Sequence, residues 1–375
     1  MVINELYLDG FRNYYDTKAI FGNGVNVING RNAQGKTNLI EAVNYLATGR
    51  SFRPAGDKEL ISFDREKACI RAAIISGKRE QTLEARIFRG LRRQFFANDV
   101  KLKKLTELTG RLTTVLFCPD DLTIIKDGAA VRRKLMDNCL IQLRTGYLSA
   151  LTEFNKLYEH KTRILKDHYE KPSLLDLLDD FNMQLAQQSA KLISYRSSFT
   201  EILTKKAAEI HKEFTDGKEA LTIKYVTVGR MDASGKKPHE LLPDLLKHQN
   251  DHRQAELKSR LCLSGAHKDD IEIEINGIAA RRFASQGQAR TAAVSIKLAE
   301  REIHRDERSE YPVLLLDDVL SELDSKRQSF ILGRIKHGQV FITSCDDSPA
   351  LSNHIGKILK IENGTIHESL RNGNA

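Results

Sequence analysis

The order of apolar and polar residues along the chain predicts a mixed α/β protein. Apolar residues alternate with polar ones over 2–8 and 18–21, and the stretches 68–75, 82–88 and 92–96 are strand-like. A period of two is typical of half-buried strands, and the dipeptide Asn98-Asp99 that follows predicts a hairpin turn. The mostly apolar run 25–28 and the unbroken apolar run 313–316 fit strands that are buried on both faces. We therefore expect an antiparallel meander beside at least two buried strands.

Long helices are expected in the middle of the chain. Between 140 and 202, apolar residues recur every three or four positions, and Lys171-Pro172-Ser173 divides them into two runs. This pattern predicts an αα-hairpin of two antiparallel helices, each of roughly 30 residues or more. A short coiled coil and a packed helical lobe would look alike here, and the broad apolar stripe favours the lobe. Further on, the pattern predicts a strand over 221–228, a helix over 241–263, and a strand over 271–275 before an Asn276-Gly277 turn.

Charge indicates a polyanionic partner. The 375 residues include 59 Lys and Arg against 50 Asp and Glu, a net charge of +9. Each basic cluster could contact DNA or could simply be a solvated face. The candidates for DNA contact are Arg92, Arg93, Lys103, Lys104, Arg132 and Arg133, with Lys101, Lys205, Lys206, Arg281 and Arg282 as further members of basic clusters.

Several protein classes are disfavoured by composition. No apolar run approaches the roughly 18 residues of a membrane-spanning helix, and Glu5 stands where a signal peptide needs basic and apolar residues. We therefore expect a cytoplasmic protein, and the family resemblance described below implies that it is nucleoid-associated. The five cysteines are scattered without a C-x-x-C motif, so we expect small buried residues rather than disulfides or a zinc site.

One motif points to nucleotide binding. The sequence Gly30-Arg31-Asn32-Ala33-Gln34-Gly35-Lys36-Thr37 fits G-x-x-x-x-G-K-T and lies between the apolar run 25–28 and a helical pattern over 38–46. Glycines let backbone amides turn toward an anion, and the helix adds the positive end of its dipole. In such a phosphate-binding loop, Lys36 would neutralise the β- and γ-phosphates, and the Thr37 hydroxyl would hold Mg²⁺.

A second set of residues would complete this machinery. The run 313–316 ends in Asp317 and Asp318, at the end of a parallel strand where α/β sheets bind ligands. Asp317 would hold Mg²⁺, directly or through water, and Asp318 would orient or deprotonate the attacking water. The alternative is a strand that simply ends in a polar turn. Upstream, Ser285-Gln286-Gly287-Gln288 opens a helical pattern over 291–305, which makes a second site suited to an anion.

These motifs, in this order, resemble the ATP-binding-cassette (ABC) heads of SMC-like proteins. The segment 285–288 is similar to the ABC signature, and Ser321-Glu322-Leu323-Asp324 is similar to the D-loop that follows the Walker B strand. A narrower resemblance, to the RecF family, covers nearly the whole chain. The segments that carry it are 11–14, 29–38, 119–122, 132–137, 265–270 and 285–288.

The resemblance implies a fold and its site residues. The fold is an ABC-type P-loop ATPase head of the α/β class with an antiparallel β subdomain and an inserted, mostly helical lobe. The head would comprise 1–118 and 256–375, and the lobe 119–255. ATP would be bound by residues 30–38, including Asn38, and by Arg12. Mg²⁺ would be held by Thr37 and Asp317, and the catalytic residues would be Lys36, Ser285, Gly287 and Asp318.

The resemblance also implies a function. It indicates an ATP-dependent DNA-binding protein of recombinational repair, replication restart and the SOS response. Such a protein would form a homodimer on ATP at gapped duplex or at single-strand/double-strand junctions. It would help load the recombinase onto single-stranded DNA, with a RecR-type mediator as partner.

Three departures from the wider ABC pattern favour a weak, DNA-stimulated ATPase that works as a switch. Asp318 stands where Glu is usual, Thr343 or Ser344 where the switch His is usual, and Pro119-Asp120-Asp121 where a Q-loop Gln is usual. Two alternatives are an ABC ATPase subunit of a transport or other SMC-like assembly, and a metabolic P-loop kinase. Net basic charge and the missing Gln disfavour the transporter subunit, and a kinase would not explain the segments 285–288 and 321–324.

Overall fold

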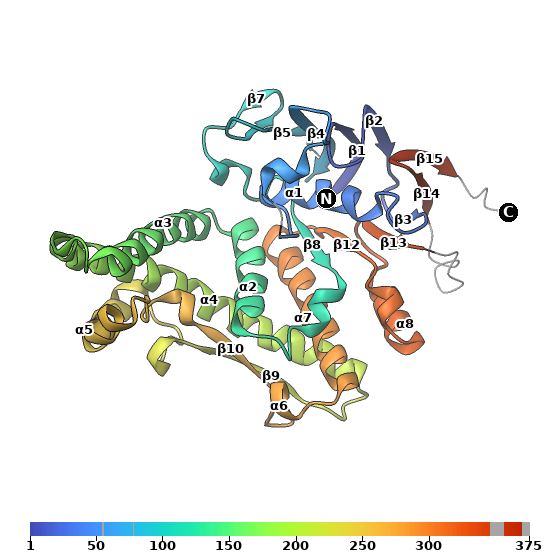
Figure 1. Cartoon of the computed structure of the whole chain (residues 1–375). Coiled ribbons are helices and arrows are strands. Elements are labelled where there is room, and N and C mark those ends of the chain that lie inside the picture. Colours follow the sequence, from blue (N-terminus) through green and yellow to red (C-terminus); the bar gives the residue numbers. More distant parts are fainter. Residues whose placement is uncertain (55, 78, 346–355, 370–375) are drawn as a thin grey trace. The chain divides into compact units, whose positions relative to one another are not determined.

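The chain divides into two units in the computed structural model, which describes residues 1–54, 56–77, 79–345 and 356–369 (Figure 1). Unit 1 comprises Met1–Thr123 and Ala293–Ala375, and unit 2 comprises Ile124–Ala292. Within the described residues, no helix has the length and apolar character needed to cross a membrane.

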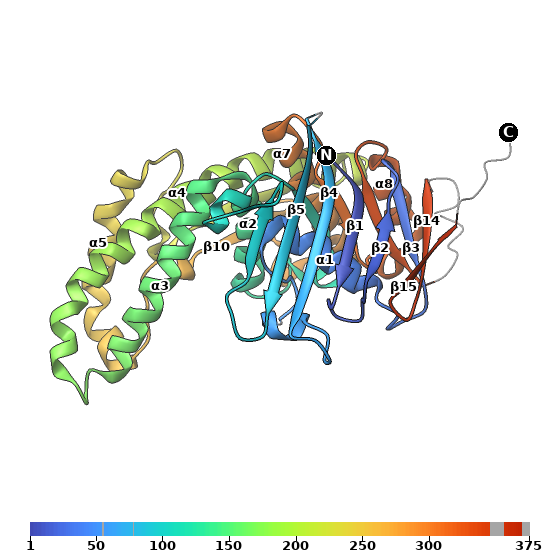
Figure 2. The same cartoon turned by 90° about the horizontal axis from the view of Figure 1, so that it is seen from above.

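Unit 1 contains an antiparallel sheet of six strands in the order β2-β1-β4-β5-β6-β7. Its strands are β1 (Val2–Asp9), β2 (Thr17–Ile20), β4 (Lys67–Ser76), β5 (Arg79–Phe88), β6 (Gln94–Ala97) and β7 (Val100–Lys101). This confirms the predicted meander. Asn98 and Asp99 both have positive φ, 49° and 63°, as the predicted tight hairpin turn requires. Figure 2 shows β4, β5 and β1 running side by side.

The second sheet of unit 1 carries the buried strands, in the order β15-β14-β3-β13-β12-β8. Its strands are β3 (Val25–Asn29), β8 (Thr114–Phe117), β12 (Val313–Leu316), β13 (Val340–Ser344), β14 (Lys357–Glu362) and β15 (Thr365–Ser369). All neighbours are parallel except β14 and β15. Because β13 pairs with both β3 and β12, the C-terminal ends of these three strands meet at one edge of the sheet.

Helix α1 (Lys36–Thr48) joins the two sheets of unit 1 into one core. It contacts β8 and β13 of the parallel sheet and β5 of the antiparallel sheet, and it is buried on nearly all sides. Leu39, Val43 and Leu46 of α1 belong to the same hydrophobic cluster as Leu83 of β5 and Phe341 of β13. Unit 1 also contains α8 (Ser325–Arg334) and most of α7 (Gln286–Arg308).

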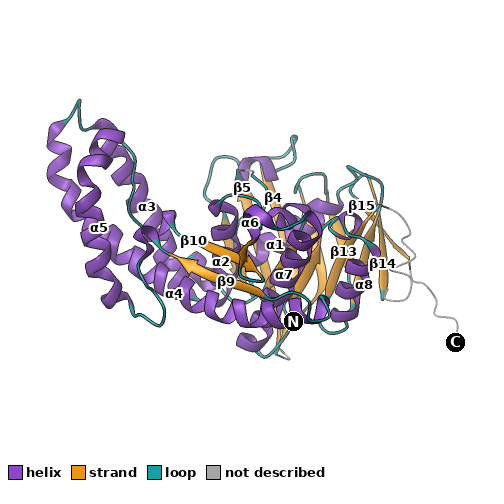
Figure 3. Cartoon of the chain, turned by 90° about the horizontal axis from the view of Figure 1, so that it is seen from below, coloured by secondary structure: helices purple, strands orange, loops and turns teal. Residues whose placement is uncertain are grey.

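Unit 2 combines helices with a small antiparallel sheet of three strands in the order β11-β10-β9. Its elements are α2 (Ala129–Leu143), α3 (Thr145–Asp167), α4 (Leu178–Phe214), β9 (Leu221–Val226), α5 (Pro238–Ser259), β10 (Asp270–Ile275), β11 (Ile278–Ala279), α6 (Ala280–Phe283) and the start of α7. Helix α4 packs against both α3 and α5 (Figure 3). The predicted αα-hairpin is thus present as α3 and α4.

The first long helix differs from the prediction, because it is broken into α2 and α3 at Arg144. This residue has extended backbone angles, φ −131° and ψ 105°. A Cβ at Gly146 would lie 2.5 Å from the hydroxyl oxygen of Tyr195 on α4. The break at Arg144 and the absence of a side chain at Gly146 therefore let the start of α3 approach α4 closely. This tertiary contact cannot be predicted from the spacing of apolar residues.

The inserted lobe also ends later than expected, at residue 292 rather than 255. The reason is strand pairing, since β10 pairs along its whole length with β9, for example Ile271 with Tyr225. The stretch 256–292 therefore completes a sheet that begins at Leu221. At the other boundary the structure places the first residue of the lobe at Ile124 instead of Pro119.

Candidate functional site

The glycine-rich loop lies between β3 and α1, and both of its motif glycines are sterically required. A Cβ at Gly30 would lie 2.5 Å from the carbonyl oxygen of Ile361 on β14. Gly35 has φ 119°, and a Cβ there would lie 2.8 Å from the Asn13 side chain. Any other residue at either position would displace the loop.

Lys36 is folded into this loop. Its side chain is 4% exposed, and its Nζ donates to the carbonyl oxygens of Gly30 at 2.6 Å and Arg31 at 3.1 Å. Nζ also lies 3.2 Å from the Cys345 thiol. That cysteine is exposed, which differs from the expectation that all five cysteines are buried. The ammonium group is thus held inside the turn of backbone where a phosphate would bind.

The segment before the loop braces it from outside, a role that the sequence analysis missed. The Asn13 amide donates to the Gln34 carbonyl at 2.9 Å and accepts from the Asn38 amide at 2.7 Å. The fully buried Tyr14 donates its hydroxyl to the Gly35 carbonyl at 2.9 Å. The only indication of this role in the sequence was the resemblance of 11–14 to a RecF-family segment. The hydrogen bonds themselves could not be predicted, because a polar turn has no periodic pattern that indicates its partners.

Arg12, a predicted nucleotide contact, is paired with the helix that follows the loop. Its guanidinium pairs with both carboxylate oxygens of Glu41 on α1 at 2.9 Å and donates to the Glu59 carbonyl. Glu41 is fully buried and also accepts from Arg53 and Ser51. Burial alone would raise the pKa of Glu41, but the hydrogen bonds from these three partners outweigh it and lower the pKa. Arg12 therefore anchors α1, and its contact with a nucleotide stays a prediction.

The aspartate pair lies beside Thr37. The Thr37 hydroxyl donates to Asp317 Oδ1 at 3.1 Å, across 280 residues of sequence. Asp317 is 5% exposed, and its burial raises the pKa of the carboxyl group above its usual value. Asp318, the next residue, has a positive φ of 51°. This backbone angle is uncommon for a residue with a side chain and turns the chain sharply at the end of β12.

Thr343, one of the two candidates for the switch position, stands between the two carboxylates. Its hydroxyl lies 3.1 Å from Asp317 Oδ1 and 3.3 Å from Asp318 Oδ1, and it accepts from the Asp318 backbone N–H at 2.8 Å. A threonine hydroxyl can orient carboxylates in this way, but it carries no charge near neutral pH.

The donor set at this edge of the sheet suits Mg²⁺. Thr37 and Asp317 offer a hydroxyl and a carboxylate oxygen that already lie within hydrogen-bond distance, and Mg²⁺ prefers oxygen ligands of this kind. Thr343 would support the carboxylate from behind, as ligands of bound metals usually require.

The signature segment lies in unit 2 and begins α7. The Ser285 backbone N–H donates to Gln288 Oε1 at 2.9 Å, and the Gln288 N–H donates to Ser285 Oγ at 3.2 Å, which is a reciprocal capping box. Gln288 Nε2 donates to Glu219, which also contacts the buried His211. Burial lowers the pKa of His211 although Glu219 opposes this effect. Ser285 is exposed and Gly287 is half-buried.

At the position expected for the Q-loop, Asp121 turns back onto its own segment. One of its carboxylate oxygens accepts from the Cys118 backbone N–H at 2.9 Å, and the other lies 3.9 Å from Lys297 Nζ on α7. Lys297 pairs at the same time with Glu300. Asp121 therefore serves as a local brace just after β8.

The predicted DNA candidates separate by exposure. Arg132 is only 3% exposed and pairs bidentately with Asp270 at 2.7 and 2.8 Å, which removes it from the candidates. Arg133 donates to the Asp269 carbonyl, and Arg93 pairs with Asp57, so both are partly engaged. The side chains that remain exposed are Arg92, Lys103 and Lys104.

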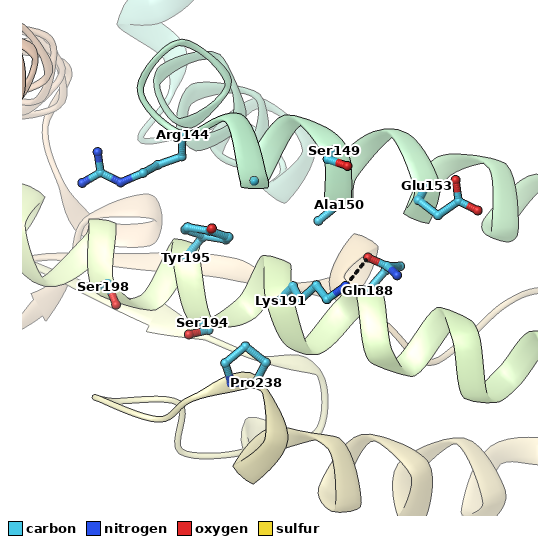
Figure 4. A pocket seen from close by; sticks show the side chains of 11 residues that line it. Arg144, Ser149, Ala150, Glu153, Gln188, Lys191, Ser194, Tyr195, Ser198 and Pro238 are labelled. Atoms are coloured by element: carbon cyan, nitrogen blue, oxygen red, sulfur yellow. Dashed lines mark hydrogen bonds between the residues drawn. The ribbon is translucent and has the colours of Figure 1, made fainter. Parts of the chain in front are cut away.

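A polar groove in unit 2 contains none of the motif residues. Figure 4 shows side chains from α3, such as Ser149 and Glu153, facing Tyr195 and Lys191 of α4, with Pro238 of α5 below. Lys191 donates to Gln188 at 3.3 Å. The groove is lined by charged groups of both signs that do not converge on a common point. We therefore assign no binding or catalytic role to this groove.

The arrangement in unit 1 defines a class of protein. A parallel sheet that carries a P-loop after β3 and an aspartate pair after β12, with α1 packed against an antiparallel sheet, is the architecture of an ABC-type ATPase head. The Smc head domain of Pyrococcus furiosus shares this fold, with a TM-score of 0.53 at 16% identity over 98% of this chain and 95% of that one.

The chain belongs to the RecF family. The family model described as RecF/RecN/SMC N terminal domain matches residues 2–366. The DNA replication and repair protein RecF of Acetivibrio thermocellus is 40% identical over 354 residues, which cover 94% of this chain and 95% of that protein. The protein of the same name from Clostridium acetobutylicum is 38% identical over 373 residues, covering 98% and 100%. A solved structure of "the recombination mediator protein RecF-ATPrS in RecFOR pathway" is 35% identical, with a TM-score of 0.91 over 98% of both chains.

The two positive residues of this site should respond differently to substitution. Lys36→Ala removes the ammonium group inside the loop, and we expect ATP affinity to fall at least about tenfold, the value of a charged hydrogen bond. Arg12→Ala leaves Glu41 buried with fewer partners, so we expect a lower melting temperature and an ATP affinity within about threefold of wild type. Titration calorimetry and thermal unfolding of both variants measure this, and equal losses of affinity would contradict it.

Proposed function

We propose that this chain binds ATP and Mg²⁺ at the loop between β3 and α1 and acts as an ATP-controlled DNA-binding protein in replication and repair. The observation that carries the proposal is the 3.1 Å contact between the Thr37 hydroxyl and Asp317. It joins the phosphate-binding loop to the carboxylate that a nucleotide-bound Mg²⁺ requires. The ATP- and ATPrS-bound RecF structures, 34% and 35% identical to this chain, support the choice of nucleotide.

Each residue of the site has a proposed part. Lys36 would turn from the Gly30 carbonyl to the phosphates, and the loop amides would bind the same oxygens. Thr37 and Asp317 would hold Mg²⁺, which supplies charge neutralisation when bound. Asp318 would orient the attacking water and accept its proton.

Hydrolysis is proposed to be slow. Thr343 or Ser344 would place a neutral hydroxyl where a histidine could have offered a positive charge to the transition state. Asp318 is one methylene shorter than the usual glutamate, and its carboxylate lies within reach of the Thr343 hydroxyl. Slow turnover suits a switch that must remain in its ATP state while a partner arrives.

Dimerisation is proposed to be the response to ATP. The exposed Ser285 and half-buried Gly287 open α7, a second helix N-terminus suited to phosphate. If this segment of one protomer met the nucleotide of the other, ATP would bridge the two and shift the monomer–dimer equilibrium toward the dimer. Ser285 and Gly287 of one protomer would then have their proposed catalytic role at the nucleotide of the other protomer.

The DNA partner is proposed to be gapped duplex and single-strand/double-strand junctions. The net charge of +9 and the exposed Arg92, Lys103 and Lys104 support electrostatic, weakly sequence-specific binding. One relative is described as a recombination mediator of the RecFOR pathway. On that basis we propose that the ATP-bound dimer recruits a RecR-type partner and helps load the recombinase onto single strands.

The proposal is tested by measuring the binding of gapped duplex with and without ATP. We expect tighter binding with ATP, and a logarithm of affinity that falls linearly with the logarithm of salt concentration because phosphate contacts release counterions. A gel shift or fluorescence anisotropy titration at several salt concentrations suffices. ATP-independent binding, or a complex insensitive to salt, would contradict the proposal.

The water-orienting part of Asp318 can be separated from nucleotide binding. Asparagine tolerates the positive φ of 51°, so Asp318→Asn should keep the turn while removing the base. We expect ATP affinity within about threefold of wild type and turnover lowered at least about 100-fold, since general base catalysis contributes that much. Single-turnover hydrolysis decides this. Lost affinity with turnover per bound ATP intact would reverse the assignment.

The dimer model predicts a specific failure of Ser285→Arg. This variant should bind ATP as the wild type does, because Ser285 lies outside the loop of its own chain, yet it should stay monomeric. Ser198→Arg, at another exposed serine of unit 2, is the matched control and should dimerise. Light scattering with ATP and Mg²⁺ provides the test. A wild-type chain that stays monomeric at saturating ATP, or a Ser285→Arg chain that dimerises, would refute the model.

A further inference from the structure

The turn before β4 exposes an aromatic ring completely. Phe63 has a relative exposure of 104%, the highest among the large apolar side chains of the described residues. Its neighbours Ile61 and Ser62 are buried, at 4% and 2%. The chain therefore enters the core of unit 1 at these two residues, and the next side chain, Phe63, is fully exposed to solvent. An exposed Phe side chain does not contribute the favourable free energy that burial of its apolar surface would give.

The turn that carries this ring is firmly held. Arg89 donates to the carbonyl oxygens of Arg65 at 2.8 Å, Ser62 at 3.0 Å and Phe63 itself at 3.3 Å. The Ser62 backbone N–H donates to the Gly10 carbonyl at 2.8 Å. The backbone that carries the ring is therefore already ordered, so binding at this turn need not order the main chain.

The surroundings of the ring are mostly basic. Lys67 at the start of β4 pairs with Phe88 at the end of β5, so the turn 62–66 and the segment 89–93 leave the same end of this strand pair. Three basic side chains are exposed at this end, against the acidic Asp64 and Glu66, and Asp64 accepts from the Tyr15 hydroxyl. The exposed basic residues are Arg65, Lys67 and Arg92.

We propose that Phe63 is a stacking platform for an unpaired nucleobase of DNA, with the neighbouring basic side chains contacting the flanking phosphates. An exposed aromatic ring near positive charges is the combination with which proteins hold single-stranded nucleic acid. Leu91, 72% exposed, is the one other large apolar side chain exposed on these two segments. Two separate apolar side chains, each followed by charged residues, make a smaller apolar surface than the core of a protein interface, so we favour DNA over a protein partner. The inference rests on the DNA-binding part of the proposed function and adds a contact specific for unpaired bases.

The position of the ring also connects it to the nucleotide site. The Ser62 hydroxyl donates to the Arg12 carbonyl at 2.7 Å, and the Arg12 side chain pairs with Glu41 on α1. The residue after Arg12, Asn13, holds the Gln34 carbonyl of the phosphate-binding loop. A base bound at Phe63 would thus contact a turn that is hydrogen-bonded to the segment bracing the loop.

The test compares two exposed apolar side chains, one near basic residues and one near acidic residues, on two kinds of DNA. Phe63→Ala should weaken binding of a gapped duplex about tenfold, the range for loss of one stacked base, and leave a fully paired duplex within about twofold. Phe63→Trp should restore the affinity. Leu177→Ala, at an exposed apolar side chain of unit 2 near Asp176, Asp179 and Asp180, is the control and should behave as wild type on both. Anisotropy at one fixed salt concentration with ATP and Mg²⁺ gives the affinities.

A second readout reports stacking directly. With 2-aminopurine at the unpaired position beside the junction, the wild type and Phe63→Trp should quench its fluorescence, and Phe63→Ala should not. Unchanged affinity and quenching in Phe63→Ala, while the wild type still binds gapped DNA, would overturn this inference and leave the proposed function standing. A wild type that binds neither duplex would overturn both. Phe63→Ala could instead keep its DNA affinity but no longer dimerise with ATP. That result would mean that the Phe63 ring contacts a second copy of the chain, and it would also overturn the inference.

Discussion

The hydrogen bond between Thr37 and Asp317 is the contact on which the site depends. The first residue lies near the start of the chain and the second near its end, and β13 lies between their strands in the sheet. The two side chains can meet only because β3, β13 and β12 are parallel and end at the same edge. The order of strands in this sheet therefore decides whether the loop and the carboxylates form one site.

The loop itself is held by residues with no part in the proposed chemistry. Asn13 and Tyr14 bond the backbone of the loop, and Arg12 pairs with the buried Glu41 of the helix that follows it. A carboxylate buried this deeply is tolerable only with such partners, because removing one would leave a charge without compensation. The segment 11–14 thus fixes the loop and α1 together, which is the rigidity that a phosphate site needs.

Sequence reasoning was sufficient where local pattern and chemistry coincide. The loop from Gly30 to Thr37, the strand ending in Asp317 and the hairpin at Asn98 follow from spacing, apolar runs and turn preference, and the structure has each of them where expected. The family and the fold class followed from the order of these motifs and are confirmed by the comparisons.

Tertiary contacts account for what the sequence did not reveal. The break at Arg144 comes from the close approach of Gly146 to Tyr195, and the late end of unit 2 comes from the pairing of β10 with β9. Arg132 looked like a surface charge because its partner Asp270 lies far away in sequence. The exposure of Phe63 was equally unpredictable, since an apolar residue beside a buried strand is ordinarily expected to be buried itself.

The most direct test of the nucleotide site is a crystal structure of the full chain with Mn²⁺ in place of Mg²⁺ and a non-hydrolysable ATP analogue. The account predicts an anomalous manganese peak within coordination distance of the Thr37 hydroxyl, with Asp317 bound directly or through one water. It also predicts that Lys36 Nζ has left the Gly30 carbonyl for the β- and γ-phosphates. A nucleotide bound elsewhere, or a metal that contacts neither Thr37 nor Asp317, would contradict the account.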